Sequence, residues 1–180
     1  YFLQTYPERV EHVVLSHCGI VSAAKAPGRV RLARMLRWLP FRISRNLVVT
    51  ASSTSYPESS RWADLTRAYF QEMTTYLRKD ALIHFYQGLA ELERDFIFDP
   101  QALEAWPGEM LLLASVDDSS SVSNMHELQA RYPRAETHVF GQGGHHVLML
   151  YPDEYIDVVR GFINTAYAHS GVGPRPEGRW

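Results

Sequence analysis

Two adjacent histidines and two adjacent aspartates are the first candidates for chemistry in this sequence. His145 and His146 end the glycine-rich segment GQGGHH, and Asp117 and Asp118 end the apolar run EMLLLASVDD. A histidine that acts as a general base needs a carboxylate to fix its tautomer and to stabilise its imidazolium form. The sequence therefore contains both partners of a carboxylate–histidine pair.

The segments around these residues have the pattern of a parallel α/β sheet. The apolar run at 109–115 and the segment ETHVF at 136–140 are typical of strands, and 124–131 and 152–166 are typical of helices. Strand, helix, strand, loop and helix in this order indicate a parallel sheet, where ligand chemistry gathers at the carboxyl ends of the strands. We expect three loops, SHCG, VDDSSS and GQGGHH, to start at that edge.

The glycines before the histidines have a conformational use. Gly141, Gly143 and Gly144 permit a tight loop that lifts a histidine above the sheet. A competing interpretation is that the two aspartates only cap the next helix and that both histidines are surface residues. Spacing alone does not decide between these interpretations.

Another buried strand is predicted near the N-terminus, where VEHVVLS at 10–16 is rich in β-branched residues. The first residues, YFLQTY, have the pattern of a helix end that stops before Pro7, and they include no initiator methionine. We therefore interpret the chain as the later part of a longer protein.

A block of about 75 residues in the middle of the chain is predicted to be helical. It contains a basic amphipathic helix, GRVRLARMLRWLP, and two further helices over 60–80 and 81–94. We expect its aromatic stripe to form mostly the core of this block, with one or two members lining an apolar pocket. The stripe comprises Trp62, Tyr69, Tyr76, Phe85 and Tyr86.

The composition is that of an ordinary soluble globular protein. The chain has 180 residues, 46% of them apolar and 21% charged, with a net charge of −2. Neither the overall composition nor the net charge suggests a nucleic-acid partner. Its one cysteine, Cys18, excludes an internal disulfide and favours a reducing, cytoplasmic compartment. No apolar run is long enough to span a membrane.

Taken together, the motifs resemble the C-terminal half of an α/β-hydrolase. The resemblance rests on YPERVEHVVLSHCG, on LLLASVDD followed by LQARYPRAETHVFGQGGHH, and on YPDEYIDVVRGFI. It implies an α/β fold in which 1–19 and 98–169 form the C-terminal part of the parallel sheet. Residues 20–97 would then form an inserted helical lid, and 170–180 a flexible tail.

The same resemblance implies site residues. The histidine of the family falls on His145, which stands seven positions before Pro152, the proline that opens the last helix. The acid of the family falls on Asp118, with Asp117 as the second choice. His146 becomes a neighbour that could line the pocket.

The nucleophile elbow of the family, G-x-S-x-G, does not occur in this sequence. The resemblance places the serine and the oxyanion donors upstream of Tyr1, so we expect the chain to be inactive alone. The implied function is a serine hydrolase that acts on an ester or a similar activated carbonyl, with an apolar acyl substrate and no cofactor. Branches of the family with an aspartate nucleophile remain open.

A second function class stays open because RVEHVVLSHCGI, MLRWLPFRI and YPRAETHVFGQGGHH also resemble maspardin, a family member thought to work as a binding partner. This resemblance implies a non-catalytic binding protein on the same fold. Retention of the Asp pair and His145 favours the enzyme. The upstream coding sequence would distinguish the two.

Three weaker hypotheses concern Cys18, a metal site and a group of arginines. Cys18 could act as a nucleophile near the expected pocket, but it lacks the elbow. His145, His146, Asp117 and Asp118 could hold a metal, although adjacent histidines usually point in different directions, and we expect none. A group of arginines in the first part of the helical block is interpreted as a solvated helix face, with contact to an anionic substrate or a membrane surface as the alternative. The group comprises Arg29, Arg31, Arg34, Arg37, Arg42 and Arg45.

Overall fold

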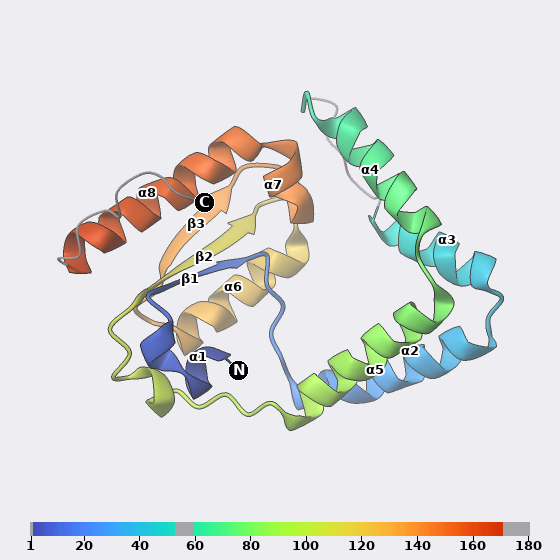
Figure 1. Cartoon of the computed structure of the whole chain (residues 1–180), viewed down its shortest axis with the longest axis horizontal. Coiled ribbons are helices and arrows are strands. Elements are labelled where there is room, and N and C mark those ends of the chain that lie inside the picture. The colour runs from blue at the N-terminus through green and yellow to red at the C-terminus, as the bar shows by residue number, and fades with distance from the viewer. Residues whose placement is uncertain (1, 53–59, 171–180) are drawn as a thin grey trace. The chain divides into compact units, whose positions relative to one another are not determined.

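The computed structural model describes residues 2–52 and 60–170 (Figure 1). These residues form two compact units. One unit consists of the segments up to Gly19 and from Asp99 onward, and the other is Ile20–Phe98. Most of the tail predicted at 170–180 lies outside the described residues.

A three-stranded parallel sheet is the centre of the first unit (Figure 1). Its strands are β1 (His12–Ser16), β2 (Glu109–Ser115) and β3 (Glu136–Phe140), in the order β1-β2-β3. The central strand β2 is almost entirely buried, which explains its continuous apolar sequence, because a strand covered on both faces has no solvent side. The parallel sheet predicted from the sequence is thus confirmed, although β1 is only half-buried along its length.

Helices cover the two faces of this sheet. The helix α8 (Pro152–Ser170) begins with Pro152 and packs against one face of β2, and α6 (Ser119–Arg131) contacts β2 from the opposite side (Figure 1). The core under α8 contains Leu111, Leu113, Phe140, Val147 and Phe162. Alternate residues of a strand point to opposite faces, so Leu111 and Leu113 share the face toward α8.

Short elements complete this unit at both ends of the sheet. They are the helix α1 (Phe2–Thr5), the single turns η1 (Pro7–Arg9), η3 (Gln101–Leu103) and η4 (Gly144–His146), and the helix α7 (Val147–Leu150). The last two follow β3 directly. They carry the chain from the strand end to α8.

All regular elements in the described residues of the second unit are helices. Its elements are η2 (Ala23–Lys25), α2 (Ala26–Trp38), α3 (Phe41–Ser52), α4 (Ala63–Thr75) and α5 (Lys79–Asp95). The helices α2 and α5 pack against each other through Leu36, Leu82 and Ile83. Within this pair, Arg29 meets the buried Glu93 at 3.3 Å between Nε and Oε1.

Two sequence predictions for this unit need correction. The helix α3 was not predicted; it starts after Pro40, whose carbonyl accepts the N–H groups of Ile43 and Ser44. The aromatic stripe was predicted to be mostly core, but Tyr69, Tyr76 and Phe85 are 46%, 70% and 61% exposed. The buried face of α4 instead carries the small side chains Ala63, Thr66 and Thr74.

No helix in the two described ranges combines the length and the apolarity that crossing a bilayer requires.

Candidate active site

The predicted carboxylate–histidine pair forms at the carboxyl ends of β2 and β3. Asp118 follows β2 and His145 lies in the single turn that follows β3. The Nδ1 of His145 lies 3.1 Å from the Oδ2 of Asp118, within the range of a direct hydrogen bond. An ionised carboxylate only accepts hydrogen bonds, so Nδ1 carries the proton and Nε2 of the neutral ring is left with its lone pair.

Asp118 uses its two carboxylate oxygens for different tasks. Its Oδ1 accepts the N–H groups of Ser120 and Ser121 at 3.1 and 3.2 Å and the hydroxyl of Ser120 at 2.6 Å, which caps the start of α6. Its Oδ2 faces His145. The sequence left open whether the aspartates cap the next helix or pair with a histidine. Asp118 does both.

The environment of Asp118 keeps the carboxylate ionised. Burial alone would raise its pKa, but hydrogen bonds from the Ser120 side chain, from His145 and from the Ser121 backbone lower the pKa to about 2. Its side chain is only 11% exposed. A charged, partly buried and multiply bonded carboxylate is suited to orient a histidine, because its own position is set by the helix cap.

Asp117 holds the glycine loop instead of His145. Its Oδ2 accepts the N–H of Gly143 at 3.0 Å, and its Oδ1 accepts the N–H of Gly144 at 2.8 Å. Both glycines have positive φ angles, +113° and +52°, which other residues rarely adopt. The aspartate that was the second choice for the acid therefore fixes the loop that presents His145.

His145 and His146 point in different directions, as the sequence predicted for adjacent histidines. Their rings are nearly perpendicular, with an interplanar angle of 89° and centroids 5.9 Å apart. The His145 side chain is 62% exposed, and among the described residues its Nε2 has no hydrogen-bond partner. One ring thus combines a fixed Nδ1 with an Nε2 open to receive a proton.

A third histidine at this edge was missed in the sequence. His17 follows β1 directly, is 7% exposed, and its ring lies 5.7 Å from the ring of His145 at an interplanar angle of 74°. Its ring nitrogens contact the hydroxyls of Ser115 at 2.7 Å and Ser16 at 3.0 Å. Its position one residue after a predicted strand, in the loop SHCG, was the available signal.

Neither Ser115 nor Cys18, both near His17, has the properties of an activated nucleophile. Ser115 makes a serine–histidine pair with His17, but it is completely buried, so no substrate can approach it. Cys18 is half-buried, its pKa is raised by burial, and its Sγ contacts the carbonyl of Ser16 at 3.5 Å. A thiol with a raised pKa is a poor nucleophile.

A metal site is not formed by these side chains. Within the part of the chain that the structure describes, no group of three or more His, Cys, Asp or Glu residues is placed to hold a metal ion. Both oxygens of Asp117 accept backbone N–H groups, and the two adjacent histidines diverge.

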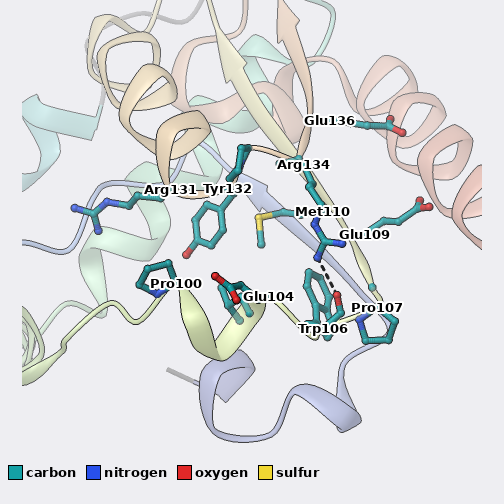
Figure 2. A pocket seen from close by; sticks show the side chains of 14 residues that line it. Pro100, Glu104, Trp106, Pro107, Glu109, Met110, Arg131, Tyr132, Arg134 and Glu136 are labelled. Atoms are coloured by element: carbon teal, nitrogen blue, oxygen red, sulfur yellow. Dashed lines mark hydrogen bonds between the residues drawn. The ribbon is translucent and has the colours of Figure 1, made fainter.

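A pocket of about 480 Å³ lies at the other end of the same strands (Figure 2). Figure 2 shows the side chains of Tyr132 and Met110 at its centre, with Pro100 and Trp106 below them. Arg134 closes one side by donating to the carbonyl of Trp106 at 2.9 Å. Because this pocket is at the amino ends of β2 and β3, it is separate from the histidine site at their carboxyl ends.

Comparisons with known proteins agree with the fold. No protein-family model matches the chain, and no curated protein matches it. One similar solved structure is MenH from S. aureus, with a TM-score of 0.58 and 15% identity over 91% of this chain and 64% of that one. Another is from a study of carboxylesterases of the ammonia-oxidizing thaumarchaeon Nitrososphaera gargenis, with a TM-score of 0.64 and 16% identity over 93% of this chain and 61% of that one.

Both of these solved structures have the α/β-hydrolase fold. The described chain has the fold of the C-terminal part of an α/β-hydrolase, as its motifs predicted. It spans less than two thirds of the length of either neighbour.

Proposed function

We propose that this chain supplies the acid and the base of a serine hydrolase that acts on an ester or a similar activated carbonyl. One observation supports the proposal above all. The Nδ1 of His145 contacts Asp118 at 3.1 Å while its Nε2 has no partner among the described residues. In the proposed triad, Asp118 orients His145, and His145 exchanges protons with a serine outside this chain.

In the proposed mechanism His145 moves one proton in each half of the reaction. Its Nε2 removes the proton of the serine as the serine oxygen bonds to the carbonyl carbon, and Asp118 stabilises the imidazolium that results. The imidazolium then gives this proton to the leaving alcohol as the ester bond breaks. Water then loses a proton to Nε2 as its oxygen bonds to the acyl carbon, the bond between that carbon and the serine oxygen breaks to release the carboxylic acid product, and Nε2 returns the proton to the serine. Backbone N–H groups outside this chain stabilise the oxyanion.

We also propose that the helical unit Ile20–Phe98 acts as a lid over an apolar acyl substrate. Large apolar side chains exposed on α4 and α5 support this part of the proposal, because sites for apolar ligands are lined mainly by such groups. They include Leu65, Tyr69, Met73 and Phe85, and Tyr76 directly after α4 is exposed as well. The free thiol of Cys18 supports a reducing, cytoplasmic location.

The test is to express this chain together with the coding sequence upstream of it and to measure hydrolysis of p-nitrophenyl acetate and butyrate. A fluorophosphonate probe, which labels activated serines, reports the nucleophile directly. We expect hydrolysis and labelling of one upstream serine in a G-x-S-x-G motif. An upstream sequence without that motif, together with no labelling and no turnover, would reject the hydrolase and favour the non-catalytic binding protein.

A further inference from the structure

Both the backbone and the side chain of His17 are held by hydrogen bonds within the first unit. Its N–H donates to the carbonyl of Leu113 at 2.9 Å, which extends the pairing of β1 with β2 by one residue. Its φ angle of +50° lies in the left-handed region that side chains other than glycine rarely adopt. A buried histidine held in this conformation indicates that the surrounding contacts outweigh the local preference of the backbone.

The ring of His17 is held at both nitrogens. The hydroxyl of Ser16 lies 3.0 Å from Nδ1 and that of Ser115 lies 2.7 Å from Nε2. Ser115 in turn donates its N–H to the Ser121 hydroxyl at 3.4 Å, and Ser121 belongs to the cap that Asp118 forms on α6. A continuous set of contacts therefore links the buried histidine to the proposed acid.

His145 has few contacts of this kind. Its side chain is largely exposed, and among the described residues a single hydrogen bond, to Asp118, holds its ring. The T-shaped contact with His17, 5.7 Å between centroids, provides a second point of support from a different strand. The ring of His146 is also 5.9 Å away, but it lies in the same turn as His145. A support from another strand restricts the ring more than the hydrogen bond does alone, and correct orientation is a large part of catalytic rate.

We propose that His17 is a positioning residue whose buried ring supports His145 in the orientation where Nδ1 faces Asp118 and Nε2 faces the reacting serine. This inference rests on the proposed hydrolase function. Nothing in the sequence assigned a role to His17, and its own nitrogens, both engaged by serines, do not touch the substrate.

The charge state of His17 fits this role. The groups that face it are His145 and His146 from the turn after β3, and Asp117 and Asp118 from the loop after β2. Burial lowers the pKa of His17, the nearby His145 lowers it further through the repulsion between two protonated rings, and the aspartates oppose this with smaller effects. At neutral pH the ring is therefore uncharged, and it does not repel the imidazolium that His145 becomes during the reaction.

The experiment compares His17→Gln with the matched control His126→Gln, which changes an exposed histidine on α6. Both variants are made in the protein that includes the upstream segment, and kcat, KM and the pH profile are measured with p-nitrophenyl butyrate. We expect His17→Gln to lower kcat about tenfold or more with little change in KM, and to alter the acid side of the pH profile. The control should match the parent protein. Unchanged kcat and pH profile in His17→Gln would overturn the proposal.

Nuclear magnetic resonance of the histidine rings tests the geometry without any activity and without a variant. In the unmodified protein at neutral pH, we expect a nuclear Overhauser effect between the rings of His17 and His145 and a single Nδ1–H tautomer of His145. Absence of the ring-to-ring effect, or mixed tautomers, would overturn the proposal even if His17→Gln did not fold. If both signals are present but no ester is hydrolysed, the hydrolase function fails while the support of His145 by His17 stands.

Discussion

Asp117 and Asp118 are consecutive residues whose carboxylates bind different parts of the same site. Asp117 accepts the N–H groups of Gly143 and Gly144, whereas Asp118 accepts those of Ser120 and Ser121 and contacts Nδ1 of His145. One aspartate thus shapes the loop that presents the histidine, and the other faces its ring.

Asp118→Asn should lower kcat/KM about 10³- to 10⁴-fold, because an amide in place of the carboxylate no longer selects the productive tautomer of His145. Asp117→Asn should lower it far less and should mainly reduce stability, by about 1 kcal/mol, since one of two acceptors for the loop N–H groups is lost. Ester hydrolysis and urea unfolding of the two variants measure these effects. A larger catalytic loss in Asp117→Asn would exchange the roles of the two residues.

The two adjacent histidines should differ as strongly in function as they do in orientation. His145→Ala should abolish ester turnover in the protein that includes the upstream segment, because no other ring in the described residues contacts Asp118 in this way. His146→Ala should cost far less, since its ring is perpendicular to that of His145. The comparison is made by kcat/KM. Equal and small losses would remove the acid–base role from both residues.

Asp118 should make stability depend on acid pH. Its pKa is about 2 in the folded protein, below the ordinary value of 3.8 that it takes in the unfolded chain. The ionised form of Asp118 therefore favours folding. This contribution, about 2 kcal/mol, is complete above pH 3.8 and is lost as the pH falls toward 2. Urea unfolding at pH 5, 3.5 and 2.5 should therefore show a smaller loss of stability for Asp118→Asn than for the parent protein. Identical pH dependence in both would contradict the assignment.

Gly143 should tolerate no side chain. Its φ angle is +113°, and a Cβ there would lie 3.0 Å from the Cα of Val147 and 3.1 Å from the Cδ2 of Tyr151. We expect Gly143→Ala to destabilise the protein by about 1–3 kcal/mol. The matched control is Gly161→Ala, at an open position on α8, which should stabilise it by about 0.5–1 kcal/mol. Thermal unfolding compares the two, and a neutral Gly143→Ala would show that the loop can adopt another conformation.

The chain expressed alone should be aggregation-prone or partly molten, and inactive on p-nitrophenyl esters. In the described residues β1 is an edge of the sheet, and unpaired strand edges with apolar surroundings promote association. Size-exclusion chromatography and thermal unfolding test this. A monodisperse monomer with a cooperative transition would show that the chain folds independently, and esterase activity would require a nucleophile among its own serines or Cys18.

Several features of the fold could be predicted because they are encoded over short distances in the sequence. The strand β2 was visible as an unbroken apolar run, since burial on both faces removes the need for polar residues. The start of α8 at Pro152 was visible because proline suits the first turn of a helix. The neighbourhood of Asp118 and His145 followed from strand order, because carboxyl ends of parallel strands share one edge.

Other features depend on contacts between distant segments, and only the tertiary structure decided them. The path of the glycine loop decides which of the two adjacent aspartates faces His145. This loop places Gly143 and Gly144 against Asp117, although they are 26 and 27 positions away from it in the sequence. The exposure of Tyr69 depends on which face of α4 the other helices cover, and a periodic pattern does not show this.

His17 is the clearest example of the difference. The sequence shows only that His17 follows a strand. In the structure its ring contacts the hydroxyl of Ser115, which is 98 positions away in the chain, and the ring of His145. The sequence by itself determined an α/β chain with a candidate acid and base at one edge of a sheet. The tertiary structure decided which atoms meet there, because hydrogen-bond partners and burial are set by packing between segments that local patterns do not relate.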